Sequence, residues 1–205
     1  MDPHQDAPPD FPDAQRAPGA GEVHVWHVAL PAEEGREAAR RALAAILAGY
    51  LGGAGRGATS ADENGKPRLA EAPERLSFNL SHAGALALVA IAPGGVEVGV
   101  DVERLRPRRD LVRLAERWLP GGDATAVAEA AEGAPREAAF YAAWTRHEAR
   151  VKCAGTGLAG PPPGPEIVAR QLDIDPAYAA ALAIDTATEP RLTWIEFAET
   201  AAMRR

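Results

Sequence analysis

The sequence predicts an α+β protein made of two similar α+β halves, each a small antiparallel sheet packed with a long helix. Two segments, 33–51 and 135–153, carry apolar residues at helical spacing. Segments between 22 and 30, between 75 and 103, and between 167 and 197 have the alternation or the apolar runs of strands. Strands and helices therefore follow one another twice along 205 residues, a length that suits one domain or two small halves.

The first half begins with a strand and a helix. Residues 22–30 alternate in a way typical of a strand, although the alternation leaves open which face is buried. The helix expected over 33–51 has an apolar stripe and ends at Gly52-Gly53, a usual stop signal; the stripe consists of Leu43, Ile46, Leu47 and Tyr50. A Gly-rich loop with an Asn64-Gly65 turn is expected to follow.

Three strands are expected next, near 75–81, 85–92 and 96–103. Small and turn-forming residues separate them, namely Ala83-Gly84 and Pro93-Gly94-Gly95. This spacing predicts an antiparallel meander.

The second half is expected to hold helices over 109–118, 123–131 and 135–153, with Pro135 in the first turn of the last one. Three further strands are expected near 167–174, 178–185 and 191–197. We therefore divide the chain into a disordered Pro- and Asp-rich tail (1–21), an N-terminal half (22–107) and a C-terminal half (108–205), with the site between the halves.

Composition excludes several classes of protein. The net charge of −7 and the pI near 5.3 disfavour general binding to nucleic acid. No apolar run is long enough for a membrane span, and the acidic N-terminus has none of the features of a signal peptide. Cys153 is the single cysteine, so a disulfide framework and a thiolate cluster are excluded. A cytoplasmic location without nucleic acid or membrane partners is expected.

The basic residues are unevenly used. The chain has 22 Lys and Arg residues, and Lys66 and Lys152 are the only lysines. Genomic bias alone can produce such a preference, so the two lysines are pointers to a function and not evidence for one.

The segment VEVGVDVER (96–104) places four valines on one face of a strand and Glu97, Gly99, Asp101 and Glu103 on the other. The valine face is expected in the core. Neighbouring carboxylates repel each other unless a cation or a proton lies between them, and Mg²⁺ favours such oxygen ligands. The alternative is an ordinary half-exposed strand with a polar face.

Two other patterns have both an ordinary and a functional interpretation. Glu148 and Lys152 lie four residues apart on the helix 135–153, which is a common helix-stabilising pair but here uses a rare lysine. Ser81-His82 ends a strand, where His82 caps a turn, is partly buried, or donates to a phosphate. No G-x-S-x-G motif surrounds Ser81, and the GGAGRG segment (52–57) follows a helix, so hydrolase and dinucleotide-binding interpretations fail.

Taken in order, five segments resemble the 4'-phosphopantetheinyl transferases. They are ARRALAAILAGYL (39–51), NGKPRL (64–69), FNLSHAG (78–84), VGVDVERLRP (98–107) and FYAAWTRHEARVKCAGTGL (140–158). The resemblance is strongest to the two-half, monomeric type that activates peptide and polyketide synthetases. A monomer is therefore expected.

The resemblance implies transfer of phosphopantetheine from coenzyme A to a serine of an apo acyl, peptidyl or polyketide carrier protein, with release of 3',5'-ADP. It implies that Asp101, Glu103 and Glu148 hold Mg²⁺, with Mn²⁺ as an alternative. Glu148, Lys152 and Asp101 are the implied catalytic residues, and Glu148 or a metal-held water is the candidate base. The implied coenzyme A contacts are Arg40, Arg41, Lys66, Pro67, Ser81, His82 and Lys152. Asp123 lies where the family often has a further acid.

The chain departs from the family at His147, where a lysine is usual, and it has few basic residues between the first strand and the first helix, Arg36 excepted. The alternative to an active transferase is consequently a homologue that binds coenzyme A or a carrier with weak or no catalysis. A metal-dependent nuclease is excluded by the negative charge and by the spacing, because no lysine follows Glu103 directly and the next one is Lys152. Arg108, Arg109 and Arg113 lie in an Arg-rich segment (104–117) that either contacts an acidic carrier or is a solvated helix face.

Overall fold

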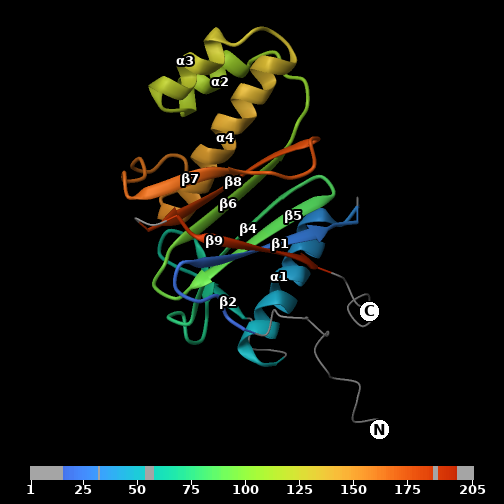
Figure 1. Ribbon diagram of the computed structural model, residues 1–205, viewed down its shortest axis with the longest axis vertical. Helices are drawn as coiled ribbons and strands as arrows, with labels where there is room; N and C mark the ends of the chain where they lie inside the picture. Colours follow the sequence, from blue (N-terminus) through green and yellow to red (C-terminus); the bar gives the residue numbers. More distant parts are fainter. Residues whose placement is uncertain (1–15, 32, 54–57, 187–188, 198–205) are drawn as a thin grey trace.

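The computed structural model describes residues 16–31, 33–53, 58–186 and 189–197 (Figure 1). Residues 1–15 of the expected tail and residues 54–57 of the Gly-rich loop lie outside them. The helices are α1 (Gly35–Leu51), α2 (Leu111–Trp118), α3 (Gly121–Glu129) and α4 (Ala134–Ala154). The strands are β1 (Glu22–Ala29), β2 (Thr59–Ala61), β3 (Pro67–Leu69), β4 (Leu76–Ala83), β5 (Leu86–Pro93), β6 (Val98–Arg104), β7 (Ile167–Leu172), β8 (Tyr178–Asp185) and β9 (Arg191–Phe197).

The first sheet has the order β4-β5-β1-β9 and packs against α1. Both faces of β1 are buried, because one packs against α1 and the other against the second sheet, and this settles the ambiguity of the sequence pattern. Trp26 and Val28 pack with the α1 side chains Ile46 and Leu47, as expected from the helical stripe. Helix α1 ends as predicted, because Gly52 adopts the left-handed backbone conformation with a φ of 77°.

The second sheet has the order β6-β8-β7, and α4 covers one of its faces. Its other face packs against the first sheet, where Val98, Val100 and Val102 meet Val23 and Val25. The predicted valine face is thus confirmed as core. The layers run α1, first sheet, second sheet, α4, and the α+β architecture is confirmed.

The predicted meander is wrong at its third strand. Strands β4 and β5 form an antiparallel pair, but β6 pairs with β8 in the other sheet. The reason is that β1 already occupies the free edge of β5, so the chain leaves the sheet through Pro93-Gly94-Gly95. At this corner a Cβ on Gly94 would lie 1.6 Å from the carbonyl oxygen of Glu74, so only glycine fits.

The last strand also joins an unexpected neighbour. Strand β9 pairs in parallel with β1, and Figure 1 shows β9 (red) alongside β1 (blue). The two sheets therefore exchange strands across residue 107, because β6 belongs to the second sheet and β9 to the first. The proposed division into halves at that residue stays a prediction about folding units.

Helices α2 and α3 pack on the N-terminal part of α4 and form a third cluster with Phe140 and Tyr141. Pro135 lies in the first turn of α4, as predicted, and Gly155 ends this helix with a φ of 70°. In the described ranges, no helix combines the length and the apolar character needed to cross a bilayer.

Glu22 is a buried carboxylate that joins β1 to the segment before it and to β9. It accepts hydrogen bonds from Arg16 (2.9 Å), the Gly19 backbone (3.1 Å), Arg191 (2.8 Å) and Thr193 (3.0 Å). The Gly19 amide, opposed by burial and aided by Arg16 and Thr193, lowers the pKa of Glu22 to about 2.

We expect the stabilisation by Glu22 to be fully present above pH 4.5, the ordinary pKa, and to be lost as the pH falls towards 2. Glu22→Gln should thus lower the melting temperature at pH 7, and the difference from wild type should shrink below pH 4.5. Thermal unfolding at several pH values checks this, with Glu71→Gln at an exposed position as the control. A difference that is the same at pH 7 and pH 3 contradicts the account.

Candidate active site

The candidate site lies where β6 meets α4. The two elements approach closely at Gly99, where a Cβ would lie 2.1 Å from the Ala149 carbonyl oxygen and 2.4 Å from the Cys153 nitrogen. Both atoms belong to the helix backbone, so a side chain at this position would force α4 away from β6. Helix α4 therefore covers the middle of the polar face of β6, where Gly99 and Asp101 are buried, whereas Glu97 and Glu103 at its ends are partly exposed.

This close approach brings Asp101 of β6 and Lys152 of α4 into contact. The Lys152 ammonium Nζ lies 2.6 Å from Oδ1 of Asp101 and 3.1 Å from Oγ of Ser81. Ser81 on β4 donates to the same Asp101 oxygen at 2.9 Å and accepts from the Val102 amide at 3.3 Å. Asp101 and Ser81 are buried, so three residues far apart in the sequence form one hydrogen-bonded centre.

Glu103 and Glu148 surround this centre with further negative charge. Burial, followed by the charge of Asp101, raises the pKa of Glu103. Burial and the charges of Asp101 and Glu103 likewise raise the pKa of Glu148, although Lys152 opposes the shift. The carboxylates destabilise one another's charged forms, which is the situation that a cation relieves.

The second oxygen of Asp101 provides the test of whether a cation fits. Oδ2 is buried and has no hydrogen-bond partner among the described residues. A buried oxygen of an acidic group without a partner is unusual and is suited to a ligand. In the described part of the chain, no three Asp, Glu, His or Cys side chains are placed to hold a metal ion between them, so Asp101, Glu103 and Glu148 do not form a ready-made three-residue site. Mg²⁺ needs only one or two protein carboxylates when phosphate oxygens and waters complete its shell, so the donors fit.

A basic hollow of about 610 Å³ lies beside the acidic centre. Arg36 and Arg40 of α1 line it together with His82 of β4. Burial, and then the charges of Arg36, Lys152 and Arg40, lower the pKa of His82. A second hollow, lined by Glu148 and Lys152, shares Pro67, Asn79 and Leu80 with the first. The two hollows are therefore neighbours, one lined by the arginines of α1 and the other by Glu148 and Lys152.

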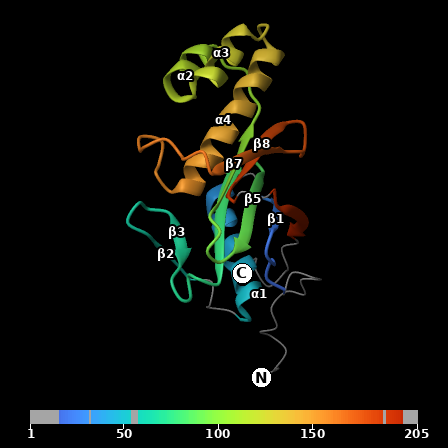
Figure 2. The ribbon, with the colours of Figure 1, turned by 60° about the vertical axis from the view of Figure 1, so that its left-hand side comes forward.

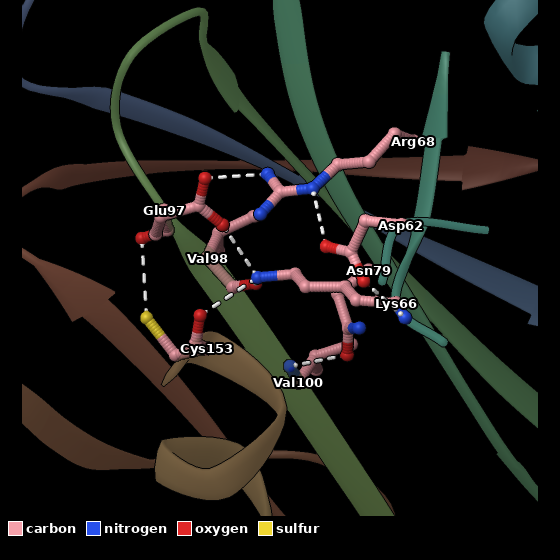
Figure 3. A network of polar contacts seen from close by, with 8 residues as sticks. All are labelled: Asp62, Lys66, Arg68, Asn79, Glu97, Val98, Val100 and Cys153. Atoms are coloured by element: carbon pink, nitrogen blue, oxygen red, sulfur yellow. Dashed lines mark hydrogen bonds and ion pairs between the residues drawn. The ribbon is translucent and has the colours of Figure 1, made fainter. Parts of the chain in front are cut away.

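Lys66 reaches this region with its stem but not with its charge. Its stem lines the second hollow, and its ammonium is buried and donates to Glu97 (2.6 Å), to the Cys153 carbonyl (2.7 Å) and to the Val98 carbonyl (3.3 Å) (Figure 3). Three protein acceptors therefore use the donors of an ammonium that the resemblance assigns to coenzyme A.

Other predicted residues lie at different places. Arg41 points to Glu34 (2.7 Å) and Glu37 (3.7 Å) on the outer side of α1, whereas Arg40 lines the hollow. Asp123 pairs with Arg146 at 3.0 Å. Burial lowers the pKa of His147, and the positive charge of Arg150 lowers it further, although the charge of Asp123 opposes the shift. This side chain is therefore neutral at pH 7.

Two polar contacts beside the centre were not predicted from the sequence. Asn79 of β4 accepts a hydrogen bond from the Val100 amide (2.9 Å). This contact joins the edge of the first sheet to β6. Glu97 pairs with both Lys66 and Arg68. The polar face of the strand did include Glu97, but a strand pattern does not indicate which basic residues approach from a distant loop.

Comparisons with known proteins show which family this chain resembles. A family profile described as the 4'-phosphopantetheinyl transferase superfamily matches residues 97–198. The 4'-phosphopantetheinyl transferase HetI of Nostoc is 36% identical over 125 residues, which cover 60% of this chain and 52% of that protein.

The chain belongs to the 4'-phosphopantetheinyl transferase superfamily. Two further relatives have the same name. AcpT of Salmonella typhimurium is 43% identical over a match that covers 45% of this chain and 47% of AcpT. The transferase psf-1 of Bacillus pumilus is 34% identical over a match that covers 46% of this chain and 38% of psf-1. The matches thus span about half the length of these relatives or less. The superfamily match includes Asp101, Glu103, Glu148 and Lys152, whereas Arg40, Lys66, Ser81 and His82 precede it.

Proposed function

We propose that this protein transfers the 4'-phosphopantetheine group of coenzyme A to a serine hydroxyl of an apo carrier protein. The observation that carries the proposal is the buried centre of Asp101, Lys152 and Ser81, with an unpartnered Asp101 oxygen, beside a hollow lined by arginines. Coenzyme A carries a 3'-phosphate and a pyrophosphate, so it needs cations at one end of its site and a charge-neutralising centre at the other.

The residues have distinct roles in this reaction. Arg36, Arg40 and His82 would bind coenzyme A phosphates at the N-terminal part of α1, where helix amides also favour anions. The serine oxygen forms a bond to the phosphorus that bears pantetheine, and the bond from that phosphorus to the bridging pyrophosphate oxygen breaks. 3',5'-ADP leaves with the electron pair, and Glu148 accepts the serine proton. Lys152 supplies positive charge beside the phosphates while its contact with Asp101 fixes its position.

Asp101, Glu103 and Glu148 would hold Mg²⁺ or Mn²⁺. A divalent cation there would neutralise the charge that develops on the phosphate oxygens. The support for this assignment is the unpartnered Asp101 oxygen and the raised pKa values of the two glutamates.

One experiment separates transfer from mere binding. Purified protein is mixed with coenzyme A, Mg²⁺ and an apo carrier, and 3',5'-ADP release is followed while coenzyme A binding is measured in parallel by calorimetry. Release of 3',5'-ADP that depends on both the carrier and the metal supports the proposal. Tight binding of coenzyme A without release would favour the alternative, a homologue that binds coenzyme A or a carrier with weak or no catalysis. That alternative is favoured by His147, which is neutral at pH 7 where the family usually has a lysine.

His147→Lys tests this departure. A lysine next to Glu148 restores a permanent cation, so we expect kcat/KM at pH 7 to stay the same or to rise, by about tenfold at most for one phosphate contact. Steady-state kinetics with coenzyme A as the varied substrate measure the change. A loss of activity greater than tenfold would mean that the histidine has a role of its own.

The Arg-rich segment is the proposed carrier surface. Arg108 and Arg109 are exposed and line a hollow of about 440 Å³ together with Arg136. Carriers in this family are acidic, and a local basic surface attracts them in spite of the net charge of −7.

Reversing the charge of both exposed arginines, in Arg108→Glu with Arg109→Glu, should raise the KM for the carrier by about tenfold or more and leave the KM for coenzyme A unchanged. Arg75→Glu, at an exposed position before β4, is the matched control. The idea fails when the double variant and the wild type have equal carrier KM values at low salt.

A further inference from the structure

Lys66 joins three segments that carry the candidate site. Its ammonium, from the turn between β2 and β3, contacts the start of β6 at Val98 and the end of α4 at Cys153. Figure 2 shows the β2–β3 ribbon beside this end of α4. The stem of Lys66 also packs on Gly155, where a Cβ would lie 3.4 Å from Cδ of the lysine. A single buried cation therefore fixes a turn, a strand and a helix end to one another.

Glu97 completes this arrangement by balancing the buried charge. One of its carboxylate oxygens accepts from Lys66 and the other from Arg68, which in turn pairs with Asp62 at 3.2 Å. Asp62 also accepts hydrogen bonds from the backbone amides of Asn64 (3.0 Å) and Lys66 (2.9 Å). The turn that presents Lys66 is thus held by the same chain of ion pairs (Figure 3). Burial opposes ionisation of Glu97, yet Arg68 and Lys66 lower its pKa, so Glu97 is charged at pH 7.

These contacts lie next to the reactive centre on both elements. Cys153 follows Lys152 directly, and Val98 precedes Asp101 by three residues on the same strand. A shift of the helix end along β6 would separate Lys152 from Asp101, since their contact at 2.6 Å joins these two elements.

We propose that Lys66 and Glu97 are positioning residues that hold the end of α4 on β6 and thereby keep Lys152 at Asp101. The competing role, in which the Lys66 ammonium binds coenzyme A, requires it to leave three protein acceptors. The proposed role rests on the proposed function, because the centre that is positioned is the transfer centre.

The single cysteine of the chain gives a direct readout that needs no catalysis. Cys153 is 1% exposed, its thiol donates to the Glu97 carbonyl oxygen at 3.3 Å, and burial raises its pKa to about 12. A thiol reagent such as dithiobisnitrobenzoate therefore reacts only when the end of α4 opens.

In Lys66→Met and Glu97→Gln we expect labelling of Cys153 to be about tenfold faster than in wild type. The first change leaves two backbone carbonyls without their donor, and the second removes the charge that balances the buried ammonium. The rate should not depend on urea at low concentration, since a local opening exposes little surface. The labelling rate of the double variant should exceed the rates of the single variants only slightly, because both substitutions break the same ion pair. Glu22→Gln, which perturbs a buried carboxylate elsewhere, should label like wild type. Unchanged labelling in both single variants, or labelling that rises steeply with urea, would overturn the proposal.

Kinetics then distinguish positioning from substrate binding. A positioning role predicts that both variants lower kcat by about tenfold while the KM for coenzyme A stays within about twofold. Glu97→Asp and Lys66→Arg, which keep the charges, should recover part of the loss. An increase in the KM for coenzyme A confined to Lys66→Met, with Glu97→Gln behaving like wild type, would assign Lys66 to coenzyme A instead. If wild type transfers nothing, the proposed function fails while the labelling experiment still tests the contact.

Discussion

Replacing Asp101 with asparagine should reduce transfer by about a thousandfold or more, because a metal ligand contributes several kcal/mol of charge stabilisation in phosphoryl-type transition states. The substitution keeps the shape of the side chain and the hydrogen bond from Ser81 but removes the negative charge beside Lys152. It acts at Oδ2, the Asp101 oxygen that is buried without a partner among the described residues. Initial rates over a series of Mg²⁺ concentrations measure the effect.

Asp173→Asn is the matched control, since Asp173 is exposed on the segment after β7. It should retain the rate and the metal dependence of wild type. Turnover by Asp101→Asn at the wild-type rate, still dependent on Mg²⁺, would refute the assignment of Asp101 to the metal.

Replacing Gly99 with alanine should be strongly damaging, although the change is conservative. The added Cβ would lie 2.1 Å and 2.4 Å from two backbone atoms of α4, which no rotamer can relieve. We expect a loss of about 3 kcal/mol in the free energy of unfolding, in the upper range of overpacking effects. Any fraction that folds should transfer poorly, because α4 must move and Lys152 moves with it. Urea unfolding and transfer rates check both effects.

Gly121→Ala provides the control for this substitution. Gly121 begins α3, and a Cβ there meets nothing within 4 Å. Alanine has the higher helix propensity, so this variant should be as stable as wild type or more stable by about 0.5–1 kcal/mol. Equal stability and equal activity of Gly99→Ala and Gly121→Ala would show that α4 does not lie as close to β6 as we describe.

Much of the fold follows from local pattern. The valines of β6, the stripe of α1 and the glycines at the helix ends all lie as the sequence predicts, because periodicity and backbone conformation are local properties. Strand partners are not local. Nothing in the residues of β6 or β9 says that they cross to the other sheet, since the edge each one occupies depends on which edges other strands have taken.

The two lysines show the same limit at the candidate site. Both lie at the contact between α4 and β6. Their roles differ, because Lys152 contacts Asp101 whereas the ammonium of Lys66 contacts Glu97 and two backbone carbonyls. Sequence motifs indicate that a charge is present, but the acceptors that surround it come from distant segments. An ammonium can point its donors at three separated acceptors, which a planar guanidinium does less well.

The intact mass of an apo carrier, measured after incubation with this protein, coenzyme A and Mg²⁺, tests the central claim most directly. The account predicts that the carrier gains the mass of one phosphopantetheine group on a serine, and that Asp101→Asn produces no gain on the same timescale. A carrier of unchanged mass, with a protein that is folded and binds coenzyme A, would contradict it.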